Sequence, residues 1–182
     1  MKPLENWEEV NEGREVRDLQ PGIYLLKITD VKDVPEKEYL EIYFDIAKGE
    51  FKDYFGLAKA NMGRDISKEI RSYKETALPF FKRFITAVEK SNPEYHWDWD
   101  ETKLVGKFVI GVFGEEEYVK DNDIKISCKL QEFRSIPSYK EGKIKVPEIK
   151  RLPEDMRPTD YSKVFKTKNV DLLDLSDDDL PF

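Results

Sequence analysis

The segment Tyr39–Ile46, YLEIYFDI, alternates large apolar side chains with polar or amphipathic ones at every position. Successive side chains of a β-strand point to opposite faces, so this alternation predicts a strand with one buried face. The predicted buried face consists of Leu40, Ile42, Phe44 and Ile46, and the predicted outer face of Tyr39, Glu41, Tyr43 and Asp45. Residues 39–46 are therefore expected to lie in a sheet with the core on one side.

Two further strands are predicted close to this segment. Residues 23–31 follow the turn signal QPG at 20–22 and carry apolar residues on both faces. DVPEK at 33–37 predicts the turn that joins them to residues 39–46. Residues 50–55, EFKDYF, are predicted to form a short third strand.

A helix is predicted in the segment TALPFFKRFITAVEKSNP, residues 76–93. The apolar residues of this segment recur at helical spacing and predict one buried stripe, formed by Leu78, Phe81, Ile85 and Val88. Proline is tolerated in the first turn of a helix, so Pro79 places the start near Thr76. A start at Ser72, with Glu75 closing a capping box, is the alternative and would leave Pro79 farther inside the helix.

Two more strands are predicted at 107–113, KFVIGVF, and 123–133, DIKISCKLQEF. The acidic segment GEEEYVKDND between them is expected to be the loop of a hairpin. Three strands, a helix and a hairpin follow one another in the order of an OB-fold, a small Greek-key barrel. The predicted fold class is therefore mainly β with one helix, an OB-fold-like five-stranded Greek-key barrel followed by a disordered C-terminal tail.

The composition is rich in charge, with 38% charged residues among 182, yet Trp, Tyr and Phe make up 13% and argue against general disorder. No apolar run approaches the length of a membrane span, and the N-terminus lacks the apolar core of a signal peptide. A cytoplasmic location without membrane association is therefore expected.

The residues of catalytic chemistry are scarce. The chain has one cysteine and one histidine, too few for a zinc cluster, and it contains no phosphate-binding loop or nucleophile motif. No enzymatic activity and no cofactor are therefore expected. Cys128 alternates with Ile124, Ile126 and Leu130, which predicts a small core residue, and a single cysteine excludes an internal disulfide.

The domain boundaries follow from changes in composition and charge. Residues 1–20 are predicted to be an N-terminal extension and 21–138 the barrel domain. Residues 139–168, with nine Lys/Arg against five Asp/Glu, are predicted to be a basic linker. Residues 169–182 contain five Asp and no basic residue, and are predicted to be an acidic tail.

The chain ends in DDDLPF, residues 177–182, an ending that is unusual for a tail serving only solubility. Proline lowers the entropy lost on binding, and a terminal phenylalanine offers both a ring and a carboxylate to a partner. The aspartates would steer such a peptide toward a basic surface. The residues predicted to bind a partner are Asp177, Asp178, Asp179, Leu180, Pro181 and Phe182.

This ending resembles the C-terminal tip of bacterial single-stranded DNA-binding proteins, which end in aspartates, an apolar residue, proline and phenylalanine. YLEIYFDIAKGEFKDYF and RSYKETALPFFKRFITAVEKSNPEYHWDWDETKLVGK look like a phage-encoded group of such proteins from Gram-positive hosts. The second resemblance covers about residues 20–135. Together they imply sequence-independent binding of single-stranded DNA and recruitment of replication, recombination and repair proteins by the tip. Bacterial relatives are often tetramers, so a homo-oligomer is one expectation.

Single-strand binding needs cations for phosphates and aromatic faces for bases. The segment 56–90 has eight Lys/Arg against four Asp/Glu, and outward tyrosines are expected on neighbouring strands. The predicted DNA-binding residues are Tyr43, Lys52, Tyr54, Lys59, Arg64, Lys68, Arg71, Tyr73 and Lys74. Each tyrosine also fits a half-exposed strand residue, and the lysines also fit a solvated helix face. Glu41 and Asp45 share the face of Tyr43 and would repel phosphate there.

Two other functions fit parts of the sequence. A protein-interaction adaptor would use the tail to compete for the partners of the host's single-stranded DNA-binding protein, and predicts an exposed apolar patch. A metal-dependent nuclease predicts three or more carboxylates that converge in a cleft. The strand-binding function predicts instead a continuous positive surface with exposed aromatic rings.

Overall fold

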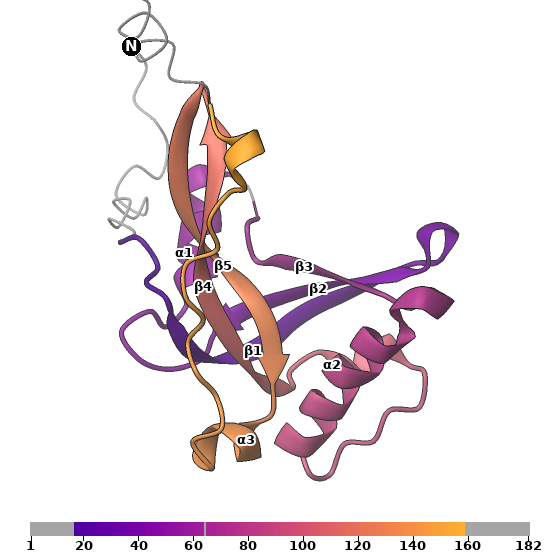
Figure 1. Ribbon diagram of the computed structural model, residues 1–182. Coiled ribbons are helices and arrows are strands. Elements are labelled where there is room, and N and C mark those ends of the chain that lie inside the picture. Colours follow the sequence, from indigo (N-terminus) through magenta and orange to yellow (C-terminus); the bar gives the residue numbers. More distant parts are fainter. Residues whose placement is uncertain (1–16, 64, 159–182) are drawn as a thin grey trace, which may run out of the picture.

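The computed structural model describes residues 17–63 and 65–158 (Figure 1). The predicted acidic tail and most of the predicted N-terminal extension lie outside these residues. The strands are β1 Gly22–Val34, β2 Tyr39–Ile46, β3 Lys68–Ser72, β4 Phe108–Lys120 and β5 Asp123–Arg134. The α-helices are α1 Tyr54–Met62, α2 Leu78–Ser91 and α3 Ile136–Lys140, and short 3-10 turns lie at Pro35–Lys37, Glu75–Ala77, Glu101–Leu104 and Glu154–Met156.

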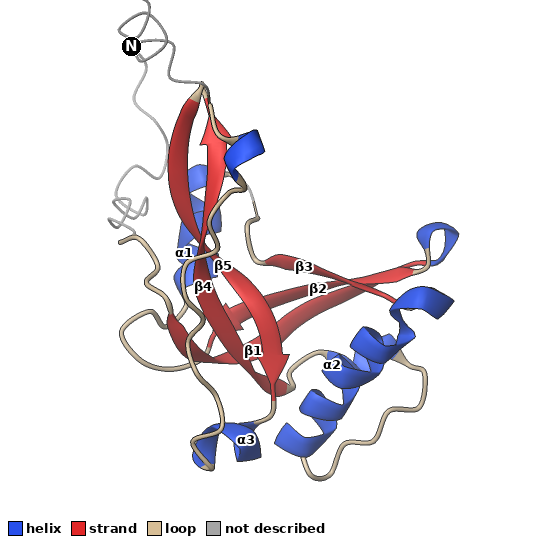
Figure 2. Ribbon diagram, viewed as in Figure 1, coloured by secondary structure: helices blue, strands red, loops and turns tan. Residues whose placement is uncertain are grey.

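The strands of the described chain form one antiparallel sheet in the order β3-β2-β1-β4-β5 (Figure 2). The sheet curls until its edge strands β3 and β5 approach each other, which makes a nearly closed barrel. α2 follows β3 and precedes β4, as in an OB-like fold. The predicted OB-fold-like five-stranded barrel is thus confirmed, although the described residues form three α-helices where one was expected.

The alternation in residues 39–46 is confirmed side chain by side chain. The predicted buried face of β2 is buried at every position, and its other face is half-buried. Phe44 lies at the centre of the core, with its ring in edge contact with Phe55, Phe113 and Phe133. The strand therefore orients Tyr39, Glu41 and Tyr43 toward the outside of the barrel.

The third strand was predicted in the wrong place. Residues 51–53 form a turn and Tyr54 begins α1, whereas the third strand is β3, Lys68–Ser72. Asp45 explains the helix start, because its carboxylate accepts the backbone N–H groups of Phe55 at 2.9 Å and Gly56 at 2.9 Å. These donors have no partner inside a first helical turn. Asp45 is therefore a capping residue, and its charge faces the helix.

α2 begins at Leu78 with Pro79 as its second residue, which confirms the predicted start and excludes the start at Ser72. Phe81, Ile85 and Val88 are buried against the sheet as predicted. Leu78 is 43% exposed, so the predicted stripe is one residue shorter at this end. None of the helices in the described residues is long and apolar enough to cross a membrane.

The β4–β5 hairpin is longer than predicted. Residues 114–120, expected to lie in its loop, belong to β4, and the turn consists of Asp121 and Asn122 alone. Both turn residues have positive φ, 54° and 63°, as a two-residue hairpin turn requires. The outer half of the hairpin projects beyond the rest of the sheet (Figure 1).

Part of the segment predicted as a basic linker lies against this hairpin. Lys150 donates its backbone N–H to the Glu115 carbonyl and accepts from the Glu117 N–H, both at 2.9 Å. Arg157 then pairs with the Glu117 carboxylate at 2.9 Å. We call residues 147–157 the edge segment, because they cover the edge of β4 beyond the end of β1.

Candidate nucleic-acid interface

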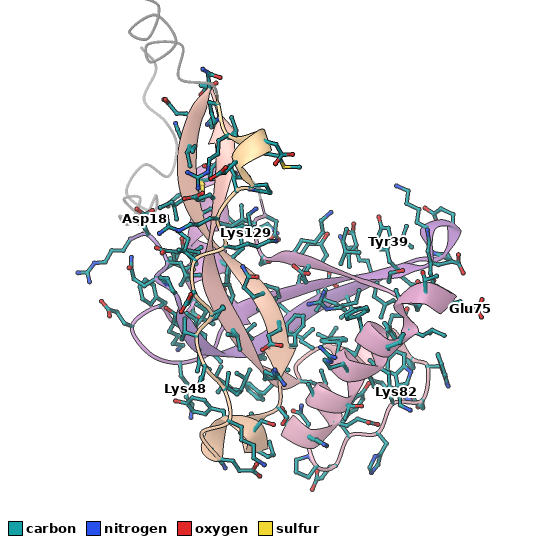
Figure 3. The ribbon with its side chains drawn as sticks, viewed as in Figure 1. Asp18, Tyr39, Lys48, Glu75, Lys82 and Lys129 are labelled. Atoms are coloured by element: carbon teal, nitrogen blue, oxygen red, sulfur yellow. The ribbon has the colours of Figure 1, made fainter. Side chains whose placement is uncertain are left out.

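The outer face of β1, β2 and β3 is the first candidate site. The strand register aligns outward residues in three rows: Val34–Tyr39–Ser72, Lys32–Glu41–Ile70 and Asp30–Tyr43–Lys68. Tyr39 projects on the side of the sheet away from α2, which carries Lys82 (Figure 3). The rows therefore lie on the solvent side of the barrel, and we call them the outer face.

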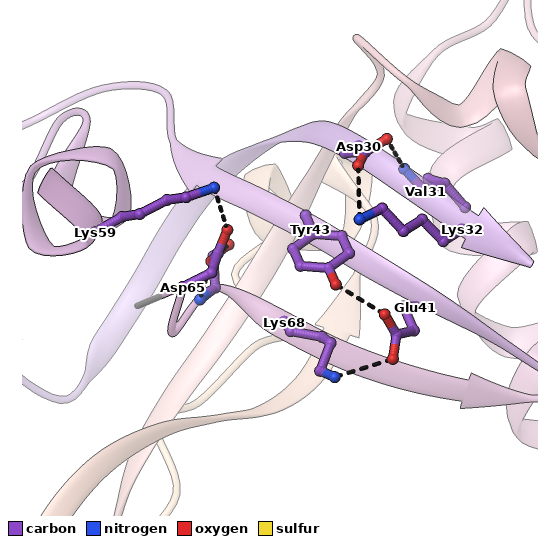
Figure 4. A network of polar contacts seen from close by, with 9 residues as sticks. Asp30, Val31, Lys32, Glu41, Tyr43, Lys59, Asp65 and Lys68 are labelled. Atoms are coloured by element: carbon purple, nitrogen blue, oxygen red, sulfur yellow. Dashed lines mark hydrogen bonds and ion pairs between the residues drawn. The ribbon is translucent and has the colours of Figure 1, made fainter. Parts of the chain in front are cut away.

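Glu41 organises the centre of this face (Figure 4). Its carboxylate accepts the Lys68 ammonium at 2.9 Å and the Tyr43 hydroxyl at 2.8 Å. The hydrogen bond from Lys68, followed by that from Tyr43, lowers the pKa of Glu41 below its usual value. The same contact raises the pKa of Tyr43 to about 12. Glu41 is thus an anion held between a cation and a hydroxyl donor.

Lys32 adds a second cation to the same place. Its ammonium lies 5.1 Å from the centre of the Tyr43 ring, a cation–π distance, and 3.9 Å from Asp30 Oδ2. The sequence prediction missed Lys32, because it ended the first strand at Val31. The strand continues to Val34, so Lys32 stands beside Glu41 in register. Continuing the alternation past Val31 would have found it.

Tyr43 and Lys68 are the predicted residues that the structure brings together on the outer face. Lys59, on α1, pairs with Asp65 at 3.0 Å beside the same face (Figure 4). Lys52 lies in the turn before α1, 3.8 Å from Asp53. Arg64 lies outside the described residues.

Tyr54, Arg71, Tyr73 and Lys74 occupy other places. Tyr54 is half-buried at the end of the barrel, and burial raises its pKa. Arg71 aligns with the buried Leu40, so it faces the barrel side of β3. Tyr73 donates its hydroxyl to Asp33 at 2.8 Å, which raises its pKa to about 12, and Lys74 is exposed on the way to α2.

A cavity of about 510 Å³ opens between β3, β5 and α1. Aromatic rings from Phe44, Tyr54 and Phe113 line its floor, and Lys68 and Lys129 lie at its rim. Lys68 thus belongs both to this cavity and to the outer face. Cys128 also lines it, and burial raises the pKa of its thiol to about 11, so it stays a protonated packing residue.

A second cavity, about 730 Å³, lies along α2 and is mostly apolar. Phe81 and Ile85 form its base, and Trp97 and Trp99 one wall. Trp99 is 77% exposed and has a φ of 67°, a left-handed conformation that costs a side chain of this size free energy. The surroundings therefore hold an indole in solvent beside an apolar groove.

The described residues contain no group of three or more His, Cys, Asp or Glu side chains placed to hold a metal ion. A scan of the chain against protein-family models finds no match, and a search of curated proteins finds no significant relative. The arguments for function therefore rest on the residues themselves.

Proposed function

We propose that this protein binds single-stranded DNA without sequence preference, through the outer face of its OB-like barrel. One observation carries the proposal: Tyr43 stands between two lysines, Lys32 and Lys68, on the solvent side of β1–β3. Aromatic rings accept any base by stacking, and neighbouring cations accept the phosphates. OB-folds bind oligonucleotides on the face of strands 2 and 3, where Tyr43 and Lys68 lie.

Glu41 marks the place of a phosphate. Its carboxylate accepts from Lys68 and from the Tyr43 hydroxyl, and a phosphate oxygen would accept from the same two donors. Binding then exchanges one anion for another at Lys68. Lys32 would move from the Tyr43 ring to a second phosphate and free that ring for a base. The acidic residues of this face, which in the sequence argue against phosphate binding, thus pair with Lys68 and Lys32 and hold these lysines in position in the free protein.

The C-terminal residues would supply the second half of the function. The tip Asp177–Phe182 lies outside the described residues, and its support is its resemblance to the tips of bacterial single-stranded DNA-binding proteins. We propose that it recruits replication, recombination or repair proteins during phage DNA metabolism. The barrel would hold the strand while the tip brings the enzymes to it.

The test is a fluorescence-polarisation titration of the full chain with oligo-dT and with a duplex of equal length, at several salt concentrations. The proposal expects tight binding of the single strand, weak binding of the duplex, and a log–log salt slope of about −0.7 per neutralised phosphate. Lys32→Ala and Lys68→Ala should each reduce the slope by about 0.7. No binding of oligo-dT at low salt would reject the proposal.

The apolar groove along α2 favours a second function, the protein-interaction adaptor. Trp99 and Leu78 are exposed at this groove, and an exposed apolar groove is typical of a protein-binding surface. Two substitutions distinguish these functions. Trp99→Ala would abolish partner binding by an adaptor and leave the oligo-dT titration unchanged, whereas Tyr43→Ala would do the reverse.

A further inference from the structure

The outer edge of β5 is open. Among the described residues β5 pairs with β4 alone, and β3, the other edge of the sheet, forms no ladder with it. An unpaired edge presents N–H and C=O groups to any strand that can align with them. Most proteins protect such an edge with charges, prolines or a covering segment.

The backbone groups that face outward can be identified from the edge segment. Lys150 bonds to the Glu115 C=O and the Glu117 N–H, so these groups point away from β5. In an antiparallel ladder the residues opposite them also point away from the shared interface. The residues opposite Glu115, Glu117 and Val119 are Cys128, Ile126 and Ile124. These three residues therefore direct their backbone groups to the open edge.

The two edges of the hairpin differ in their protection. The edge of β4 carries Glu115 and Glu117 and is covered by the edge segment. The edge of β5 carries Ile124, Ile126 and Cys128, and no described segment covers it. Ile126 is 55% exposed. The outward-directed positions of β5 are thus uncharged and uncovered, whereas Lys125 and Lys129 project from the other face of the strand. An open edge of this kind can accept a second strand.

We propose that β5 of a second copy of this chain pairs with it, antiparallel, about a two-fold axis at Ile126. About a two-fold axis the same residues of both copies form the interface, so each residue must fit the residue that faces it across the axis. The sequence DIKISCK, residues 123–129, meets this requirement. Ile126 meets Ile126 of the second copy, Ile124 meets Cys128, Lys125 meets Ser127, and Asp123 meets Lys129, which are opposite in charge.

The backbone fits the same register. Ile124, Ile126 and Cys128 all point outward, so they align as hydrogen-bonded pairs that exchange about six N–H···O bonds in total. An axis at Ile124 would leave only the tips of the hairpins paired. An axis at Cys128 would place Ile124 opposite Glu132. The axis at Ile126 is the one that matches apolar with apolar and acid with base along the exposed part of β5.

The first experiment is sedimentation velocity of the full chain over a wide range of concentration, with Ile126→Pro and Val146→Pro. Proline at 126 removes an outward N–H and leaves the ladder with β4 intact, so the barrel should still fold, as circular dichroism would verify. Val146 is the control, because it is exposed and lies outside both the strands and the edge segment. We expect a dimer for the wild type and Val146→Pro, and a monomer for Ile126→Pro. A monomeric wild type, or an unchanged dimer in Ile126→Pro, would overturn the proposal.

Disulfide trapping tests the register without disturbing the edge. Hydrogen-bonded residues across an antiparallel pair have Cα atoms about 5.5 Å apart, within reach of a disulfide. Ile126 lies on the proposed axis and is exposed, so in Ile126→Cys the two introduced thiols should form a covalent dimer under mild oxidation. Lys125→Cys, one residue away and on the opposite face, should not. Equal trapping of both variants, or none of Ile126→Cys, would contradict the register.

Discussion

The Arg71 guanidinium lies 4.8 Å from the centre of the Phe133 ring, across the gap between β3 and β5. It also pairs with Glu69 at 2.9 Å, and both charged side chains face the barrel side of β3. At this point the barrel is therefore closed by a cation over an aromatic ring in place of a backbone ladder, and the ion pair with Glu69 on the same strand holds that cation. Arg71, predicted to bind DNA, has a structural explanation that is sufficient by itself.

Arg71→Ala should lower the free energy of unfolding by about 1–3 kcal/mol, because it leaves the half-buried Glu69 unpaired and exposes Phe133. Urea denaturation measures this. Arg134→Ala is the matched control, since Arg134 also pairs with a glutamate but its side chain is 46% exposed against 20% for Arg71, and it should change stability by less than about 0.5 kcal/mol. Equal losses in the two variants would show that the contacts of Arg71 with Phe133 and Glu69 stabilise the fold no more than the ion pair of Arg134.

Tyr43→Ala should weaken oligo-dT binding by about 1–3 kcal/mol, the free energy of one stacked base. Tyr43→Phe keeps the ring and should lose much less. Tyr73→Ala is the control, because its hydroxyl is bound to Asp33 and its ring packs against Phe81. Polarisation titrations of the three variants compare them directly. A larger loss for Tyr73→Ala than for Tyr43→Ala would place the strand elsewhere.

Glu41→Gln should strengthen oligo-dT binding by about fivefold, since it removes a negative charge from contact distance of a phosphate. The amide still accepts a hydrogen bond from Lys68 or Tyr43. The control is Glu36→Gln, in the turn before β2. If Glu41→Gln weakens binding, the phosphate does not occupy the place of this carboxylate.

The contact between Glu41 and Tyr43 has a signature at high pH. Because the folded pKa of Tyr43 is raised from 10.0 to about 12, its protonated hydroxyl stabilises the fold below pH 10, and this contribution is lost as the pH rises toward 12. In an ultraviolet titration, the wild type minus Tyr43→Phe difference should have its midpoint near 12. In the Glu41→Gln background the midpoint should fall toward 10. An unshifted midpoint in that background would mean that Glu41 does not hold the hydroxyl.

Tyr95→Phe should leave the free energy of unfolding unchanged or raise it by up to about 1 kcal/mol. The Tyr95 hydroxyl is buried and has no hydrogen-bond partner among the described residues, so removing it removes a desolvated polar group. Burial also raises the pKa of Tyr95 to about 12. Thermal unfolding followed by circular dichroism measures the change. A clear drop in Tm would reveal a hidden partner for the hydroxyl.

The sequence predicted the strands that are rich in apolar residues and missed the one that is not. β2 and residues 124–130 of β5 carry apolar residues at every second position, so these segments could be recognised as strands. β3, KEIRS, faces the barrel with Glu69 and Arg71, which satisfy each other. Such a strand does not carry apolar residues at every second position, so the sequence does not reveal it. Residues 50–55 contain three aromatic side chains, which favour a strand, but the carboxylate of Asp45 caps a helix that begins there.

A residue of the candidate site could be predicted only where its orientation follows from the sequence of its own strand. Tyr43 points outward because its neighbours in β2 point inward, and this follows from local alternation. The position of Lys32 over its ring depends on the register between β1 and β2, which includes a bulge between Ile28 and Asp30. Register of this kind is set by contacts across the sheet. The pairing of Lys68 with Glu41, 27 residues apart, likewise depends on tertiary structure.

The order of the strands also determines when the barrel can be completed. The two hairpins join residues that are close in sequence, whereas the ladder between β1 and β4 joins Lys27 to Phe108. At about 5–20 residues per second, the ribosome delivers β5 about 5–20 s after β1. Until β4 is translated, the buried Leu26 lacks Val109, its neighbour in the sheet. The half-synthesised barrel is thus the stage at which this chain most needs protection by a chaperone.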